Sequence, residues 1–293
     1  MNSVIGGTAK LNTGYDIPLL GLGTDKIRGA ELKATVDKAL ALGFRLFDTA
    51  RHYANEHELG AALEELLPKH NLTREDVFLT TKFHMSADDP AGGARAYVME
   101  SLERLRTSYI DMMLIHYPKS ERCDEKDERN KLHRKLSYLE LEKLKNEGKV
   151  RSAGVSNYEI RHIEEIKEYS KMVPCANQIE IHPHFTREDL RQYCKKEGIF
   201  VQAFASLARM APQLVQEPLL ISTAKKYSTS VASILLAWAH CQGIGVIPRS
   251  RSETNLRANI EMTKLVLTEE EIESISKLNL NKNYIRCYGW RVT

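Results

Sequence analysis

Three features that would indicate other classes of protein are missing from this 293-residue sequence. It has no run of about 18 apolar residues, the length that crosses a membrane, and its N-terminus MNSVIGGTAK lacks the charged segment and apolar run of a secretion signal. Basic residues alternate with acidic ones and the formal net charge is only +3, so there is no basic stripe for nucleic acid. We therefore expect a cytoplasmic protein with neither a membrane nor a nucleic-acid partner.

Cysteine is scarce and irregularly spaced. The five cysteines form no CxxC pair of the kind that binds zinc or exchanges disulfides, which fits a reducing cytosol. His182 and His184 form an HxH pair, but the sequence offers no obvious third ligand, so we predict no metal site.

The GxGxxG fingerprint of an open dinucleotide-binding sheet is also absent. Gly21 and Gly23 supply two of its glycines, but Lys26 stands where the third is needed. The hydrophobic share of 42% is enough for a large core. Because barrels of alternating strands and helices use about 250 residues as one unit, we predict a single domain over residues 1–293.

Short apolar segments alternate with amphipathic ones along the chain. Eight segments read as buried strands: 19–24, 44–50, 77–83, 112–117, 150–157, 176–182, 200–206 and 245–250. Between them, apolar residues recur at helical spacing, for example at Leu132, Leu136 and Leu139. Eight strand–helix repeats predict an α/β fold in which a parallel sheet closes as a (β/α)8 TIM barrel.

Three segments lie outside this alternation. Residues 8–18 carry an Asn12-Thr-Gly14 turn and predict an N-terminal β-hairpin that plugs the barrel floor. The mixed-charge segment 119–135 and the C-terminal tail after Leu278 are predicted to be long loops over the active-site face. The tail aromatics either wall a substrate pocket or simply pack against the barrel: Tyr284, Tyr288 and Trp290.

Ionisable residues stand where the predicted strands end. Asp48, Lys82 and His116 each close a strand, and Tyr53 follows Asp48 by five residues. The carboxyl ends of barrel strands open onto one rim, so the four side chains are expected to converge. Each one has an ordinary structural explanation by itself, and it is the joint placement that indicates a site.

The chemistry of such a group suits carbonyl reduction. A phenol with a pKa near 10 is a poor acid unless a neighbouring cation favours its anion. Lys82 would be that cation, paired with Asp48, and Tyr53 would then donate the proton. His116 would hydrogen-bond the carbonyl oxygen and orient it.

The sequence strongly resembles the aldo-keto reductase family over nearly its whole length. Six motifs occur in family order at strand ends: FDTARHYANEHELG at 47–60, TTKF at 80–83, LIHYPK at 114–119, GVSN at 154–157, NQIEIHP at 177–183 and IPRS at 247–250. The resemblance implies an NADPH-dependent reductase of aldehydes and ketones. It places the family's catalytic tetrad on Asp48, Tyr53, Lys82 and His116.

The resemblance also implies a cofactor site. The nicotinamide carboxamide would be held by Ser156, Asn157 and Gln178, and Phe204 would supply the flat ring on which the nicotinamide stacks, where the family usually has tyrosine. Arg249 with Ser250 would bind the 2′-phosphate of NADPH. The remaining cofactor residues implied are Gly23, Thr24, Asp48, Ser206, Leu207, Arg251, Asn255 and Asn259.

Several departures from the family affect specificity. The usual arginine and glutamate near the adenosine are Asn255 and Ala258, so NADH is a weaker alternative cofactor, unless Arg251 replaces the missing charge. At two positions where the family frequently has tryptophan, this sequence has Asp25 and Tyr117, which predicts a more polar substrate pocket. We assign Tyr53, His116, Tyr117 and Asp25 to the substrate site.

Two other functions remain open from the sequence. Lys82 could form a Schiff base with a carbonyl substrate, as in aldolases, or the barrel could retain NADPH without turnover. The expected partner is a small carbonyl compound, and we expect a monomer, with a dimer as the alternative. The physiological substrate and direction do not follow from the sequence.

Overall fold

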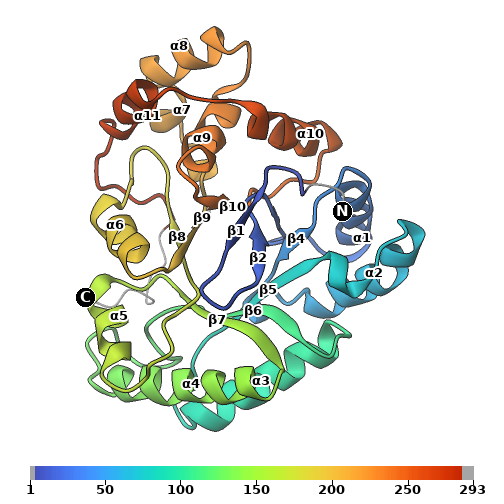
Figure 1. The fold of residues 1–293 in the computed structure, drawn as a ribbon, viewed down its shortest axis with the longest axis vertical. Coiled ribbons are helices and arrows are strands. Elements are labelled where there is room, and N and C mark those ends of the chain that lie inside the picture. Colours follow the sequence, from blue (N-terminus) through green and yellow to red (C-terminus); the bar gives the residue numbers. More distant parts are fainter. Residues whose placement is uncertain (1–3, 286–293) are drawn as a thin grey trace.

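The computed structural model describes residues 4–285 and contains a closed barrel of parallel strands. The strands lie in chain order: β3 (Leu22–Gly23), β4 (Leu46–Asp48), β5 (Phe78–Phe83), β6 (Ile110–Ile115), β7 (Val150–Ser156), β8 (Ala176–Glu180), β9 (Phe200–Phe204) and β10 (Gly245–Val246). Gly21 donates its N–H to the carbonyl of Val246 at 2.9 Å, and Val246 donates to Leu19 at 2.8 Å. These bonds join the last strand to the first, which confirms the predicted (β/α)8 barrel (Figure 1).

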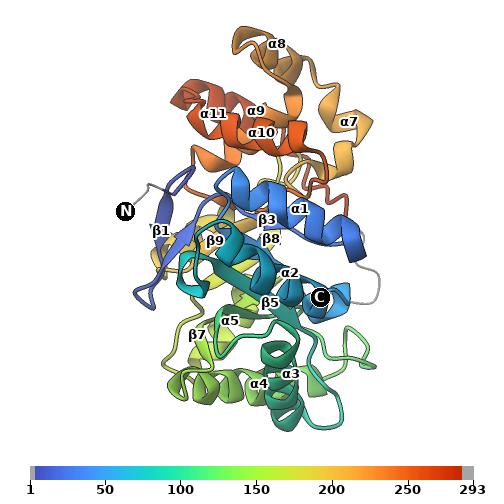
Figure 2. The same cartoon turned by 90° about the vertical axis from the view of Figure 1, so that its right-hand side faces the viewer.

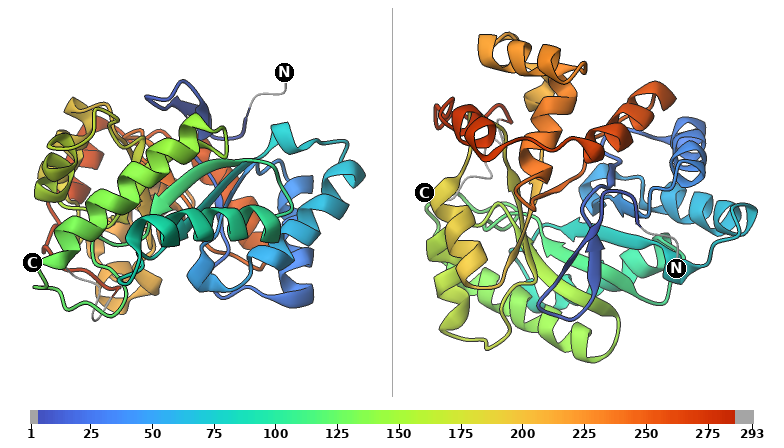
Figure 3. Two further views of the ribbon diagram at one scale, coloured as in Figure 1. Left: turned by 90° about the horizontal axis from the view of Figure 1, so that it is seen from below. Right: turned by 45° about the horizontal axis from the view of Figure 1, so that its top comes forward.

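Helices surround the strands, as Figures 1 and 3 show. They are α1 (Gly29–Ala41), α2 (Glu56–Lys69), α3 (Pro90–Arg104), α4 (Arg129–Asn146), α5 (Ile160–Lys167), α6 (Glu188–Lys196), α7 (Pro212–Val215), α8 (Pro218–Lys226), α9 (Val231–His240), α10 (Glu253–Glu261) and α11 (Glu269–Ser276). Short 3-10 turns are η1 (Arg51–Tyr53), η2 (Arg74–Asp76), η3 (Ala208–Met210) and η4 (Met262–Lys264). None of the helices in residues 4–285 is long and apolar enough to span a membrane.

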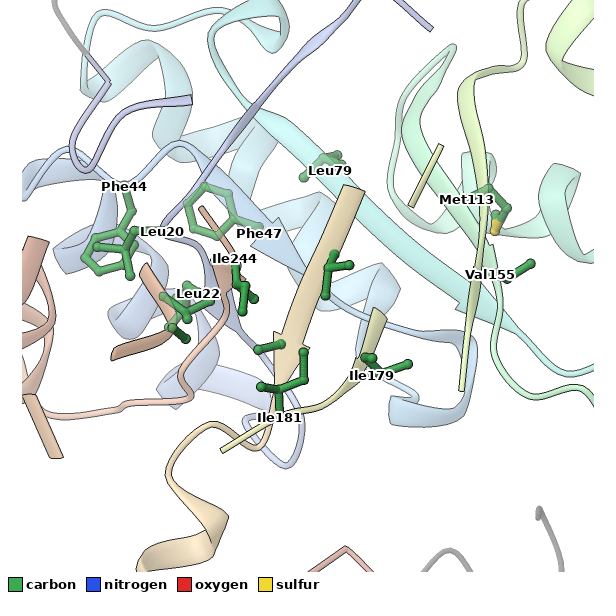
Figure 4. Close-up of a cluster of buried hydrophobic side chains, with 14 of the residues drawn as sticks. Leu20, Leu22, Phe44, Phe47, Leu79, Met113, Val155, Ile179, Ile181 and Ile244 are labelled. Carbon is green, nitrogen blue, oxygen red and sulfur yellow. The ribbon is translucent and has the colours of Figure 1, made fainter. Parts of the chain in front are cut away.

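The strands divide their side chains between two cores because successive residues of a strand face opposite sides of the sheet. Outward-facing residues such as Phe47, Leu79 and Met113 pack under the helices in the larger core (Figure 4). Inward-facing residues such as Leu46 and Phe78 form a second cluster inside the barrel. Two residues further along β4 and four residues further along β5, the same inward face carries Asp48 and Lys82 instead. The barrel interior is therefore apolar towards its floor and polar at the carboxyl rim.

The N-terminal hairpin closes the floor, as predicted. Strands β1 (Thr8–Lys10) and β2 (Asp16–Pro18) pair antiparallel, and Figure 2 shows them at one side of the barrel. Leu11 and Ile17 are buried in the same interior cluster as Leu46 and Phe78. The hairpin thus excludes water from the end of the barrel opposite the polar rim.

The prediction of a loop over 119–135 is wrong in its last part. Helix α4 begins at Arg129. Its buried side carries Arg134, which pairs with Glu165 at 2.6 Å, and Tyr138, whose hydroxyl donates to the carbonyl of Met172 after α5. Leu132, one of the three leucines at helical spacing, is 54% exposed. The buried side of α4 includes an arginine paired with a glutamate of α5, and a search for apolar periodicity does not detect such a pair.

Candidate active site

Asp48, Lys82 and Tyr53 meet at the carboxyl rim of the barrel. β4 and β5 are parallel neighbours, so the residues near their ends lie side by side. Lys82 Nζ donates to Asp48 Oδ1 at 2.7 Å and to the carbonyl of Thr49 at 2.8 Å, and it lies 3.5 Å from the Tyr53 hydroxyl. Asp48 and Lys82 are both 1% exposed, whereas Tyr53 at the end of η1 is half-buried. The arrangement is a buried ion pair that turns its ammonium towards a phenol open to the rim.

Burial and charge act in opposite directions on this pair. Burial raises the pKa of the Asp48 carboxyl, and the Lys82 charge opposes that rise. Burial lowers the pKa of the Lys82 ammonium, and the Asp48 charge opposes that fall. We assign the charged forms to both, because Lys82 has two oxygen acceptors within 2.8 Å and Asp48 also accepts from Gln178 Nε2 at 2.8 Å.

His116 follows β6 and brings a neutral imidazole to the same rim. Its ring centroid lies 6.1 Å from that of Tyr53, with the two planes 79° apart. Burial holds the pKa of His116 well below its usual value, and the nearby His84 and Lys82 lower it further. Its Nδ1 is buried and has no hydrogen-bond partner among residues 4–285. A neutral ring of this kind can donate one hydrogen bond to a substrate oxygen.

The residues expected to hold a nicotinamide carboxamide form one network. Ser156 Oγ donates to the carbonyl of Gln178 at 2.7 Å, and Asn157 Nδ2 donates to Ser156 Oγ and to the carbonyl of His116, both at 3.0 Å. Asn157 has a φ of +61°, in the left-handed region that asparagine tolerates better than most residues. Gln178 donates to both Asp48 and Gln202. Amide and hydroxyl groups beside the Asp48–Lys82 pair fit a carboxamide, because that group both donates and accepts hydrogen bonds.

The expected cofactor residues after β9 lie in an unusual loop. Phe204 is half-buried at the end of the strand, and Ala205 directly after it has a φ of +49°. Left-handed backbone at a residue with a Cβ carries strain, and such strain gathers at binding sites. The turn at Ala205 carries the chain on through Ser206, which is buried, and Leu207.

The expected 2′-phosphate residues lie after β10. Arg249 is exposed and donates to the carbonyl of Asp25 at 3.3 Å, so it spans from this loop to the loop after β3. Arg251 donates to the carbonyl of Lys26 at 2.6 Å and pairs with Glu31 at 3.2 Å. Both guanidinium groups therefore hold the two rim loops together.

The other adenosine candidates differ in their exposure. Ser250 and Asn259 are buried, while Asn255 on α10 is exposed. Gly23 is the last residue of β3 and Thr24 begins the loop after it, and Thr24 donates through both its backbone N–H and its hydroxyl to the carbonyl of Asp48. Thr24 thereby ties this loop to the end of β4.

The other two substrate candidates, Tyr117 and Asp25, interact with different members of the tetrad. Tyr117 stacks on His116, with ring centroids 5.0 Å apart and planes 18° apart. Asp25 is half-buried, and its charge raises the pKa of both Asp48 and Lys82. Both residues are therefore close to the four rim side chains.

Sequence reasoning missed two histidines. His84 follows β5 and its ring stacks on His116, with centroids 4.7 Å apart, and His52 in η1 contacts His84 edge-on at 5.3 Å. His84 stands immediately after the TTKF motif, so its position at a strand end was the signal that could have found it.

The described part of the tail is hydrogen-bonded to residues at and after the end of β8. The Tyr284 hydroxyl and His184 Nδ1 share a hydrogen bond of 2.9 Å, and the backbone N–H of Tyr284 donates to Glu180 at 2.6 Å. Tyr284 thus packs at the end of β8, while Tyr288 and Trp290 lie outside the described residues.

Comparison with known proteins places the chain among reductases. Residues 4–280 match the model of the Aldo/keto reductase family. The glyoxal reductase of Bacillus subtilis (strain 168) is 34% identical over 273 residues, covering 93% of this chain and 92% of that protein. The NADP-dependent D-sorbitol-6-phosphate dehydrogenase of Malus domestica is 32% identical, with 93% and 94% covered.

A solved structure is similar to this one over nearly the whole chain. The Bombyx mori aldo-keto reductase in complex with NADP superposes with a TM-score of 0.87 at 29% identity, covering 97% of this chain and 96% of that one. With the family model spanning nearly the whole chain and relatives above 30% identity, this protein is an oxidoreductase that belongs to the aldo/keto reductase family.

Proposed function

We propose that this enzyme reduces small aldehydes and ketones to alcohols with NADPH, and that Tyr53 is the proton donor. The observation that carries the proposal is the buried Lys82–Asp48 pair, with Lys82 Nζ 3.5 Å from the Tyr53 hydroxyl. The names of two relatives, a glyoxal reductase and a sorbitol-6-phosphate dehydrogenase, support small and polar carbonyl substrates.

The proton reaches the substrate from Tyr53. When the phenol gives its proton to the carbonyl oxygen, it is left as an anion, and the Lys82 ammonium stabilises that anion. Asp48 keeps Lys82 in place and prevents the buried ammonium from standing alone. Thr49 adds a second fixed acceptor, so Lys82 has little freedom to turn away from Tyr53.

His116 orients the oxygen. Because burial keeps the imidazole neutral, it does not repel the Lys82 ammonium, and it can donate one hydrogen bond to the carbonyl oxygen beside Tyr53. Donation from His116 and Tyr53 to the same oxygen stabilises the negative charge that develops on it.

The cofactor supplies a hydride to the carbonyl carbon. Ser156, Asn157 and Gln178 would hold its carboxamide, and Phe204 would lie against its ring. Arg249, with Arg251 beside it, would bind the 2′-phosphate, since a guanidinium suits phosphate geometry. NADH lacks that phosphate and is proposed as the weaker cofactor.

A Schiff base at Lys82 is the less favoured mechanism. Its Nζ is buried and donates to two oxygens, and a protonated amine held in an ion pair is a poor nucleophile. Borohydride trapping of a substrate without nicotinamide would favour that mechanism over reduction.

The test is turnover with and without the Tyr53 hydroxyl. Wild type and Tyr53→Phe are mixed with NADPH and a panel of aldehydes, and the loss of reduced-nicotinamide absorbance is followed. We expect turnover to fall at least about 10²-fold, the scale of a lost general acid, while NADPH still binds. Unchanged turnover would remove Tyr53 from the mechanism, and no turnover by wild type on any carbonyl would refute the proposed activity.

A further inference from the structure

A short segment of the chain carries Tyr53 between two buried side chains that are hydrogen-bonded to each other. The segment runs from Thr49, which follows β4, to Asn55, which precedes α2. Thr49 Oγ1 donates to Asn55 Oδ1 at 2.7 Å, and the two residues are 1% and 0% exposed. Because this bond joins the two ends of the segment, we call residues 49–55 the tyrosine loop.

Asn55 also ties this loop to the end of a neighbouring strand. Its Nδ2 donates to the carbonyl of Thr24 at 2.9 Å and to that of Ile27 at 3.0 Å, both in the loop after β3. Carbonyl oxygens can only accept, so the amide nitrogen must face them and the amide oxygen must face Thr49. One buried side chain therefore holds the tyrosine loop to the ends of both β3 and β4.

These bonds are unusual for the place of Asn55 in the chain. It stands at the N-cap of α2, where an asparagine side chain commonly accepts from the first N–H groups of its own helix. Here the side chain makes no such bond and turns to the loops beside it instead. Helix capping by the side chain therefore does not account for this residue.

Both ends of the tyrosine loop are also joined to the segments that hold Lys82. The carbonyl of Thr49 accepts from Lys82 Nζ at 2.8 Å. Glu56, the first residue after the loop, accepts from Thr81 Oγ1 at 2.6 Å, and Thr81 immediately precedes Lys82 on β5. The distance of 3.5 Å between the Tyr53 hydroxyl and Lys82 Nζ therefore depends on how the loop is held.

The backbone between Tyr53 and Asn55 needs such support. Ala54 has a φ of +51°, in the left-handed region that residues with a Cβ rarely adopt. A conformation of this kind persists only where the surrounding contacts impose it. Beside Ala54 these contacts are the buried bonds of Asn55 and one bond from the exposed Arg28 to the Ala54 carbonyl at 2.8 Å. Loss of the buried bonds would let the turn relax and would move Tyr53.

We propose that Asn55 is a positioning residue, which fixes the tyrosine loop so that the Tyr53 hydroxyl faces Lys82. Thr49 shares this role through the hydroxyl that donates to Asn55. The inference rests on the proposed function, because it takes Tyr53 as the proton donor. An ammonium stabilises a phenolate close to it. A misplaced Tyr53 therefore gives up its proton less readily during reduction, and regains its anionic form less readily for the reverse oxidation.

The experiment removes the bond that closes the loop. Thr49→Val deletes the hydroxyl but keeps the carbonyl that accepts from Lys82, whereas Thr49→Ser keeps both. Asn55→Ala removes every bond of the amide. The matched control is Thr223→Val, which makes the same substitution at a buried threonine of α8 whose hydroxyl donates to the carbonyl of Leu219 at 2.8 Å. Helix α8 lies outside the barrel, away from η1 (Figure 1).

Kinetics are measured in both directions. Reduction by NADPH uses the aldehyde on which wild type is fastest, and oxidation of the corresponding alcohol by NADP+ is followed from about pH 6 to about pH 10. We expect Thr49→Val to lower kcat for reduction about tenfold, since a misplacement of about 1 Å can cost about 10²-fold. The KM for the aldehyde and the binding of NADPH should change little.

The pH profile distinguishes positioning from a general loss of structure. Half-maximal oxidation should move up by about one pH unit in Thr49→Val, because the phenol then lies farther from the ammonium. Asn55→Ala should show both effects more strongly, and Thr49→Ser and Thr223→Val should show neither. If thermal unfolding shows that Asn55→Ala does not fold, Thr49→Val decides the question by itself.

A double variant tests whether the effect passes through Tyr53. Once the Tyr53 hydroxyl is gone, a change that acts by placing this hydroxyl has nothing left to act on. Thr49→Val in a Tyr53→Phe background should therefore lower kcat by less than about twofold beyond Tyr53→Phe alone.

The outcomes separate this inference from the proposed function. If Thr49→Val matches Thr223→Val in kcat and in pH profile, the inference is overturned and Tyr53 remains the proposed donor. A lower kcat without movement of the pH profile, or an equal fall in the Tyr53→Phe background, also overturns it. If Tyr53→Phe turns over like wild type, the proposed function fails and the inference fails with it. A lower kcat with an upward shift of the profile, restored by Thr49→Ser, supports the inference.

Discussion

Replacing Lys82 by methionine should make stability fall with rising pH more steeply than it does in wild type. The change removes the ammonium that lies 2.7 Å from Asp48 and leaves the carboxyl with Gln178 as its remaining donor among the residues described. Removing one partner of a buried ion pair typically costs about 3–5 kcal/mol when the other stays charged. Asp48 can avoid most of that cost by binding a proton.

The sign follows from the pKa of Asp48. Burial is the largest influence on this carboxyl and already raises its pKa, and Lys82→Met removes the charge that opposes the rise. Below about pH 4 the carboxyl is protonated in both folded and unfolded chains, so the variant loses little there. Above that pH the unfolded chain releases the proton and the folded one retains it, so stability falls by about 1.4 kcal/mol per pH unit until Asp48 ionises in the fold.

The assay is urea unfolding of wild type and Lys82→Met from about pH 4 to about pH 8, with the difference in unfolding free energy plotted against pH. The double variant Lys82→Met/Asp48→Asn is the matched control, because it removes both charges with side chains of similar shape and should show no such slope. Parallel curves for wild type and Lys82→Met would refute a buried, charged pair.

Three other substitutions test separate parts of the structure. Arg249→Ala should weaken NADPH binding about tenfold or more but NADH little, as fluorescence titration would show, since only NADPH offers the 2′-phosphate; equal weakening contradicts that assignment. His162 is 2% exposed and burial lowers its pKa to about 3, so its contribution to stability is complete above about pH 6.5 and is lost as pH falls, by about 1.4 kcal/mol per unit. In urea unfolding, His162→Gln should reduce the loss of unfolding free energy with falling pH. An unchanged loss would mean that other groups cause it. Gly60→Ala should cost about 1–3 kcal/mol in thermal unfolding, because its Cβ would lie 2.3 Å from the carbonyl oxygen of Arg104; a neutral effect would mean that α2 and α3 separate freely.

The barrel could be predicted because its signal is local and repeated. Each of the eight predicted strand segments overlaps one observed strand, and the hairpin forms around the predicted turn. The convergence of Asp48, Lys82 and His116 follows from the same regularity, since parallel strands bring their carboxyl ends to one rim. In such cases position along the strand is enough to place a side chain.

Side chains that depend on partners from distant segments could not be placed in this way. The buried side of α4 includes Arg134, which pairs with Glu165, 31 residues away along the chain, whereas Leu132 is exposed. The stack of His84 on His116 joins the ends of β5 and β6.

The sequence by itself determined the alternation of strands and helices, the closed barrel and the residues at its carboxyl rim, because short apolar segments, the amphipathic segments between them and the residue that ends each strand are properties of neighbouring residues. The tertiary structure alone decided that Lys82 faces both Asp48 and Tyr53, that two arginines join the loops after β3 and β10, and that histidines line the approach to His116. Those relations depend on distances between segments that only packing brings together.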